Sequence, residues 1–210
     1  QLNKKEDQLD LLQKQLNDKQ KNLDAMQDSL DVRQKRVNDL ETLIAQQNTA
    51  ISDLKPKITS ALTGFDKNDL SVTVKDGKVY VSMSEQLLFK SGSTAIDPKG
   101  QDALKKLADV LQKNLDVDVM VEGHTDNVVL AGNNDLMQDN WDLSVKRATT
   151  IVRLLQKQYG LNPAQLVAAG RSEYKPIADN STAEGKARNR RTRIVVLPQL
   201  DQFFKLLEKK

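Results

Sequence analysis

The chain has 210 residues, with 32 Lys and Arg, 29 Asp and Glu, one His and no Cys, and a formal net charge of +3. Without Cys it has no disulfide framework, thiolate metal site or cysteine nucleophile, and so small a charge does not indicate nucleic-acid binding. No apolar run approaches the roughly 18 residues of a membrane span. Because the first residue is Gln, we interpret the chain as a trimmed product from which an N-terminal anchor or targeting segment is missing.

The composition divides the chain into two regions. Residues 1–58 contain no Phe, Tyr, Trp or Gly, and their ten basic side chains balance ten acidic ones. All the aromatic residues and all nine Gly lie after this segment. A globular domain rarely lacks both kinds of residue over such a length, so a single compact domain is excluded.

Aliphatic residues recur every seven positions through the first region: Leu2, Leu9, Leu16, Leu23, Leu30, Val37, Ile44, Ile51 and Ile58. A repeat of 3.5 residues predicts a left-handed coiled coil. The second core position alternates between apolar and polar or charged residues, which disfavours oligomers larger than a dimer. We predict a parallel, dimeric coiled-coil rod over 1–58, about 85 Å long, with Pro56 kinking or ending the helix. The alternative is an amphipathic helix packed on its own chain, for which a wider apolar stripe is typical.

The second region has the pattern of an α+β domain. Apolar and polar residues alternate at 70–74 and at 78–83, on either side of Asp76-Gly77. This pattern predicts two strands joined by a tight turn, which is a β-hairpin. Asp97-Pro98 supplies an N-cap and a first-turn proline for a helix. We place a connector at 59–69, the domain at 70–198 and a helical tail at 199–210. The other predicted elements are a strand at 117–121, a helix from Ser144 to Gly160, a strand at 166–169, a polar loop with one helical turn at 171–190, and a strand at 192–197. Together they predict a sheet covered by two helices on one face.

Three sequence blocks carry a family resemblance. Residues 123–127 (GHTDN), 140–148 (NWDLSVKRA) and 180–191 (NSTAEGKARNRR) resemble the signature of OmpA-like peptidoglycan-binding domains, and the second block is most similar to MotB-like members. The resemblance implies a βαβαβ two-layer sandwich in the periplasm. It also implies non-covalent binding of the diaminopimelate residue of the peptidoglycan stem peptide, without enzymatic activity and without a cofactor.

A side chain of diaminopimelate ends in an ammonium and a carboxylate on one carbon, so its site needs an anion and a cation close together. Asp126 follows a predicted strand end, where its carboxylate can accept the ammonium. If Ser144 caps the following helix, Arg147 lies on the first turn, and a ligand carboxylate would meet its guanidinium and free backbone N–H groups. The resemblance assigns the same roles to this Asp and Arg. Otherwise, Asp126 only caps a turn and Arg147 forms a surface ion pair.

The remaining candidates surround this pair. The resemblance places Thr125, Asn140, Leu143 and Ser144 along the pocket, and we expect Asn189 and Arg190 to brace the site more than to touch ligand. We predict that the only histidine, His124, is a buried structural residue, because zinc needs at least three protein ligands and there is no other His or Cys. Trp141 is expected to be a packing anchor.

Lys90 stands where outer-membrane members of the family commonly have Asp, so the acidic contact from this loop is expected to be absent. We predict a dimeric periplasmic anchor of the cell envelope whose partners are peptidoglycan and a second copy of the chain, without nucleic acid. The alternative is a MotB-like stator subunit of an ion-driven motor. The first would be held at the outer membrane as a lipoprotein, and the second at the inner membrane by a preceding transmembrane helix.

Overall fold

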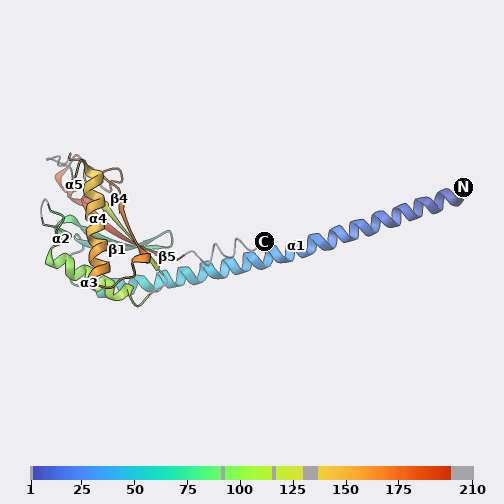
Figure 1. The fold of residues 1–210 in the computed structure, drawn as a ribbon, viewed down its shortest axis with the longest axis horizontal. Coiled ribbons are helices and arrows are strands. Elements are labelled where there is room, and N and C mark those ends of the chain that lie inside the picture. The colour runs from blue at the N-terminus through green and yellow to red at the C-terminus, as the bar shows by residue number, and fades with distance from the viewer. Residues whose placement is uncertain (1, 91–92, 115–116, 130–136, 200–210) are drawn as a thin grey trace. The chain divides into compact units, whose positions relative to one another are not determined.

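The computed structural model describes residues 2–90, 93–114, 117–129 and 137–199. The chain separates into two compact units, one up to Gln46 and one over Gln47–Leu200, and we describe each by itself. The elements are α1 (Leu2–Ala61), β1 (Leu70–Lys75), β2 (Lys78–Ser84), α2 (Glu85–Leu88), α3 (Pro98–Leu111), β3 (Val117–His124), α4 (Asn140–Lys157), a 3₁₀ turn (Pro163–Gln165), β4 (Leu166–Gly170), α5 (Ala183–Asn189) and β5 (Arg191–Pro198) (Figure 1). The predicted helical tail lies outside the described residues, apart from Gln199.

The first unit is the part of α1 before Gln47, and it exposes its heptad stripe. Leu9, Leu16 and Leu23 are each 60–66% exposed, although they are the apolar side chains that a coiled coil would bury. The helix itself is supported by side-chain hydrogen bonds four residues apart, such as Gln20 to Asp24. Part of the predicted coiled-coil core thus forms an exposed apolar stripe along this helix.

The last turns of α1 belong to the second unit. Ile51, Leu54 and Ile58 are at most 2% exposed and pack in the core of the α+β domain. The helix continues through Pro56 to Ala61, so of the two predicted effects of Pro56 the helix end is wrong, while a kink there stays a prediction. The buried residues on both sides of Pro56 hold the helix, and the carbonyl group that loses its donor is that of exposed Ser52, where water can satisfy it.

We therefore expect Leu54→Ala to destabilise the domain. Removing a fully buried leucine side chain costs about 2–4 kcal/mol in unfolding free energy. Leu11→Ala is the matched control, because Leu11 is an exposed leucine of the same helix that lies outside the heptad stripe. Urea unfolding followed by the fluorescence of Trp141, the only tryptophan, measures the difference. Equal unfolding midpoints for the two variants would contradict the core assignment.

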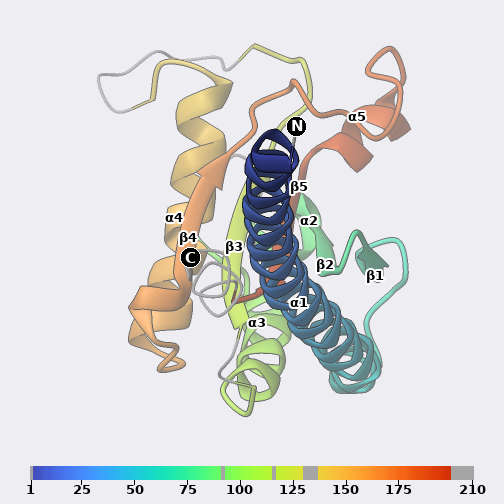
Figure 2. The same cartoon turned by 90° about the vertical axis from the view of Figure 1, so that its right-hand side faces the viewer.

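The strands form one mixed sheet in the order β1-β2-β5-β3-β4. β1 and β2 form the predicted hairpin, in register from Leu70 opposite Met83 to Lys75 opposite Lys78. Asp76 and Gly77 have φ angles of 50° and 66°, as a type I′ turn requires. β3 pairs antiparallel with β5 and parallel with β4 (Figure 2). The loops after β3 and β4 therefore leave the sheet at the same end.

Helices α3 and α4 cover one face of this sheet. Leu104 and Leu107 of α3 and Ile151 and Leu155 of α4 are fully buried in one core with the inward-facing strand residues Val79, Val81, Val119, Val121, Ile194 and Val196. Asp97 caps α3 as predicted, since its side chain accepts a hydrogen bond from Lys99 N, and Pro98 begins the helix. The predicted α+β sandwich with helices on one face is confirmed. Among the described residues, no helix combines the length and the hydropathy needed to cross a membrane.

Candidate functional site

Helix α4 begins earlier than predicted. Its N-cap is Asp139, whose side chain accepts hydrogen bonds from Trp141 N (2.8 Å) and Asp142 N (3.1 Å). The prediction that Ser144 caps this helix is wrong, and Arg147 does not lie on the first turn. The free backbone N–H groups at the start of α4 are therefore not beside Arg147, and they cannot bind the same ligand carboxylate as its side chain.

Ser144 instead fixes the helix against the sheet. A Cβ atom on Gly123 would lie 2.1 Å from Ser144 O, and one on Gly170 would lie 2.6 Å from Ser144 Oγ. These glycines pair across β3 and β4, so α4 rests directly on them. Ser144 Oγ donates to Trp141 O (2.9 Å) and accepts from Ser172 N (3.2 Å). This packing places Arg147, one turn further on, beside the end of β3.

Asp126 and Arg147 lie at opposite ends of a chain of ion pairs. Asp126 Oδ2 accepts from Arg190 Nη1 at 2.6 Å, and Glu85 Oε2 accepts from Arg190 Nε at 2.6 Å. Glu85 Oε1 in turn accepts from Arg147 Nη2. Asp126 and Arg147 are buried, with side chains 7% and 6% exposed, whereas Arg190 is 31% exposed. The four formal charges sum to zero.

Glu85 is a member of this ion-pair chain that was not among the predicted site residues. It begins the short helix α2, which is capped by Ser84 and held by the buried Leu87 and Leu88. Its backbone N–H donates to Arg190 O at 3.0 Å. The loop containing Lys90 was expected to leave the site without an acidic contact, but α2, just before that loop, supplies one.

Two buried donors at the site have no partner among the described residues. They are Thr125 Oγ1 and Arg147 Nε. The Arg147 guanidinium also lies 5.2 Å from the centre of the Phe89 ring, which restricts its position. A buried polar atom without a partner is costly. Both atoms are therefore available to a polar ligand.

The two asparagines order the surrounding loops. Asn140 Nδ2 donates to Val128 O (3.0 Å), Glu173 Oε2 (3.1 Å) and Asp126 O (3.3 Å). Asn189 is fully buried and binds the backbone of Ile177 and Ala178. Leu143 is half-buried on α4. Of the predicted residues, Asp126 and Arg190 are in direct contact, and Arg147 joins them through Glu85. In the described part of the chain, the side chains of Asn189 and Leu143 form no hydrogen bond or ion pair with these four side chains.

Trp141 is not the buried packing anchor that was expected. It is 46% exposed and lies against Tyr174, with the ring centres 5.6 Å apart. Its backbone N–H donates a hydrogen bond to the side chain of the N-cap residue Asp139. Trp141 therefore lies in the first turn of α4, and its side chain does not pack in the core.

His124 belongs to a separate cluster around Glu122. Burial alone would raise the pKa of Glu122, but the His124 ring, whose Nε2 lies 3.7 Å from Oε2, and the hydrogen bonds from Arg171 and Arg193 outweigh it and hold this pKa well below its usual range. Burial lowers the pKa of His124, which favours the neutral ring. Both residues are at most 2% exposed, as predicted for a structural histidine. No group of three or more potential metal ligands occurs within the part of the chain that the structure describes.

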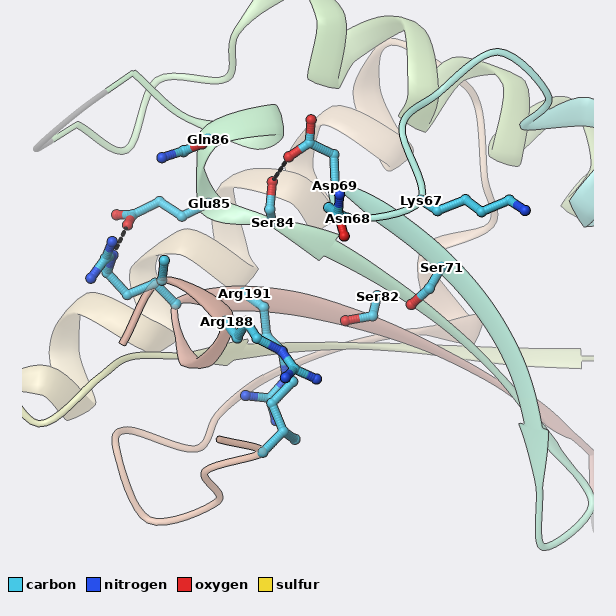
Figure 3. A pocket seen from close by; sticks show the side chains of 13 residues that line it. Lys67, Asn68, Asp69, Ser71, Ser82, Ser84, Glu85, Gln86, Arg188 and Arg191 are labelled. Carbon is cyan, nitrogen blue, oxygen red and sulfur yellow. Dashed lines mark hydrogen bonds and ion pairs between the residues drawn. The ribbon is translucent and has the colours of Figure 1, made fainter. Parts of the chain in front are cut away.

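A groove of about 460 Å³ adjoins the ion-pair chain. Glu85 and Gln86 lie at one end, and the hydroxyl groups of Ser71 and Ser82, on paired strands, lie further along it (Figure 3). Arg190 also lines the groove. Glu85 and Arg190 thus line the groove, whereas their buried partners Arg147 and Asp126 do not.

The model of the OmpA family matches residues 88–190, which include α3, β3, α4 and β4 and end at Arg190 of the ion-pair chain. The chain belongs to the OmpA family. The resemblance drawn from the three sequence blocks is confirmed, including the similarity to MotB.

Three known proteins are similar to this OmpA-family chain in sequence or structure. It is 32% identical over 133 residues to motility protein B of Bacillus subtilis, which covers 63% of the chain and 50% of that protein. It is 36% identical over 129 residues to probable lipoprotein YiaD of Escherichia coli, which covers 61% and 56%, respectively. The structure of the cell wall anchor of the T6SS from Pseudomonas aeruginosa is 32% identical, with a TM-score of 0.60, and covers 69% of this chain and 99% of that one. The chain spans about half the length of the curated relatives it matches.

Proposed function

We propose that this OmpA-family chain binds peptidoglycan non-covalently, by holding the free zwitterionic end of diaminopimelate in the stem peptide. The observation that carries the proposal is a buried carboxylate, Asp126, and a buried guanidinium, Arg147, at the two ends of one ion-pair chain. The ligand ammonium would bind Asp126, and the ligand carboxylate would bind Arg147.

The unpartnered donors support this assignment. Arg147 Nε can donate to an entering carboxylate, and Thr125, the residue before Asp126, has a second buried donor without a partner among the described residues. A guanidinium binds a carboxylate with two parallel hydrogen bonds, whereas a lysine ammonium cannot. Asn140 and Asn189 act indirectly, by ordering the loops that carry Asp126 and Arg190.

We propose that the protein is a non-enzymatic anchor in the periplasm and that it dimerises through the exposed stripe of α1. Because Ile51, Leu54 and Ile58 pack within the domain, the coiled coil of this proposal spans about residues 2–47 instead of 1–58. Two kinds of anchor are proposed. The similarity to a probable lipoprotein supports anchoring at the outer membrane as a lipoprotein. The similarity to a motility protein supports anchoring at the inner membrane as a stator-type subunit.

Co-sedimentation with purified sacculi tests the proposal. The chain is expected to sediment with sacculi whose stem peptides contain diaminopimelate and to remain in the supernatant with sacculi that contain lysine at this position. Lysine keeps the ammonium but lacks the adjacent carboxylate, so it cannot form the charge-assisted hydrogen bonds to Arg147. Equal sedimentation with both kinds of sacculi, or with neither, would contradict the proposal.

A further inference from the structure

We infer that Glu85 and Arg190 occupy the empty site as stand-ins for the two charges of the ligand, so that binding is an exchange of ion pairs and Glu85 determines specificity. This inference rests on the proposed function. Glu85 supplies the carboxylate that Arg147 would otherwise take from the ligand. Arg190 supplies the cation that Asp126 would otherwise take from the ligand.

The exchange conserves both charge and pairing. In the free protein, Arg147 pairs with Glu85, and Asp126 pairs with Arg190. When a zwitterion enters, Arg147 takes its carboxylate and Asp126 takes its ammonium. The displaced Glu85 and Arg190 keep each other, because Glu85 Oε2 and Arg190 Nε already lie 2.6 Å apart. Since the network and the zwitterion are each neutral, no charge is left without a partner.

The burial pattern supports this direction of movement. Asp126 and Arg147 are fixed and at most 7% exposed, whereas Glu85 and Arg190 are 17% and 31% exposed. Glu85 and Arg190 also both line the groove beside the site, which gives the displaced pair space in which to move. Figure 3 shows Glu85 at this groove. The pair that must leave is therefore the more accessible one.

A ligand with only one of the two charges cannot complete the exchange. A lone ammonium would take Asp126 from Arg190 and leave Arg190 with Glu85 only, while Glu85 still holds Arg147. A lone carboxylate would displace Glu85 from Arg147 and add a negative charge to the network. Leaving a buried charge without its partner costs more than an ordinary hydrogen bond contributes. Because of Glu85, the site therefore binds only a ligand that carries an ammonium and a carboxylate on the same carbon.

Glu85→Gln in the full chain tests the inference. The probes are tripeptides of L-Ala-γ-D-Glu followed by meso-diaminopimelate, lysine or 2-aminopimelate, which carry both groups, the ammonium or the carboxylate, respectively, at the end of the third side chain. Calorimetry is expected to show about five- to tenfold tighter binding of the diaminopimelate peptide by the variant. Binding of the 2-aminopimelate peptide should also become measurable, since no carboxylate then competes for Arg147.

Glu184→Gln is the control, because Glu184 is an exposed residue of α5 outside this network, and thermal unfolding confirms that both variants fold. Unchanged or weaker binding of the diaminopimelate peptide by a folded Glu85→Gln variant would overturn the inference and would show that Glu85 only holds the arginines in place. Absence of binding by the wild-type chain would instead reject the proposed function itself.

Discussion

Replacing Arg147 by glutamine is expected to weaken binding of diaminopimelate-containing sacculi by about 100-fold or more. The variant loses a two-pronged, charge-assisted contact, and each hydrogen bond of this kind contributes about 1.5–3 kcal/mol. It also leaves Glu85 without one of its two guanidinium partners. Co-sedimentation at increasing protein concentration gives the apparent affinity of each variant.

Arg153→Gln is the matched control for this experiment. Arg153 lies on the same helix, α4, but is exposed, so removing its charge changes the net charge equally without touching the ion-pair chain. Its affinity should stay within about twofold of the wild-type value. If both variants lost affinity to the same extent, binding would follow the overall charge of the domain and not the proposed site.

Disrupting the exposed stripe of α1 is expected to reduce retention on sacculi without changing the site. Two linked domains on a polymeric wall gain about 10²–10⁴ in apparent affinity over one domain. Leu16→Asp combined with Leu23→Asp places charges in the proposed dimer interface and should remove this gain. Sedimentation equilibrium should then report a monomer, and the affinity for the diaminopimelate tripeptide should be unchanged.

The double variant Asn17→Asp and Asn22→Asp adds the same two charges to the same part of the helix, beside the stripe. It should remain dimeric and bind sacculi like the wild type. A monomeric wild-type chain, or a dimer whose disruption leaves retention on sacculi unchanged, would contradict the proposed role of the rod.

Local sequence signals predicted the framework of the domain well. Asp76-Gly77 specifies a turn that needs two positive φ angles, and Asp97-Pro98 specifies a helix start, so neither depends on distant residues. Local signals do not specify the start of α4, because Asp139 and Ser144 are both residues that favour the N-cap position. The choice between them depends on tertiary packing, since Gly123 and Gly170 let the helix approach and bury Ser144.

The ion-pair chain was only partly predictable. The family resemblance identified Asp126, Arg147 and Arg190, but Glu85 lies 62 residues from Arg147 and 105 residues from Arg190 in the sequence. No local pattern marks a glutamate at the start of a four-residue helix as their partner. The end of the rod was missed for a similar reason, because Ile51, Leu54 and Ile58 keep the heptad spacing while they pack on their own domain.

A structure of the chain with the bound diaminopimelate tripeptide tests the central claim most directly. The account predicts the ligand ammonium within hydrogen-bond distance of the Asp126 carboxylate and the ligand carboxylate on the Arg147 guanidinium, with Arg190 no longer paired to Asp126. A tripeptide bound elsewhere on the domain, with the ion pairs of Asp126 and Arg147 unchanged, would contradict it.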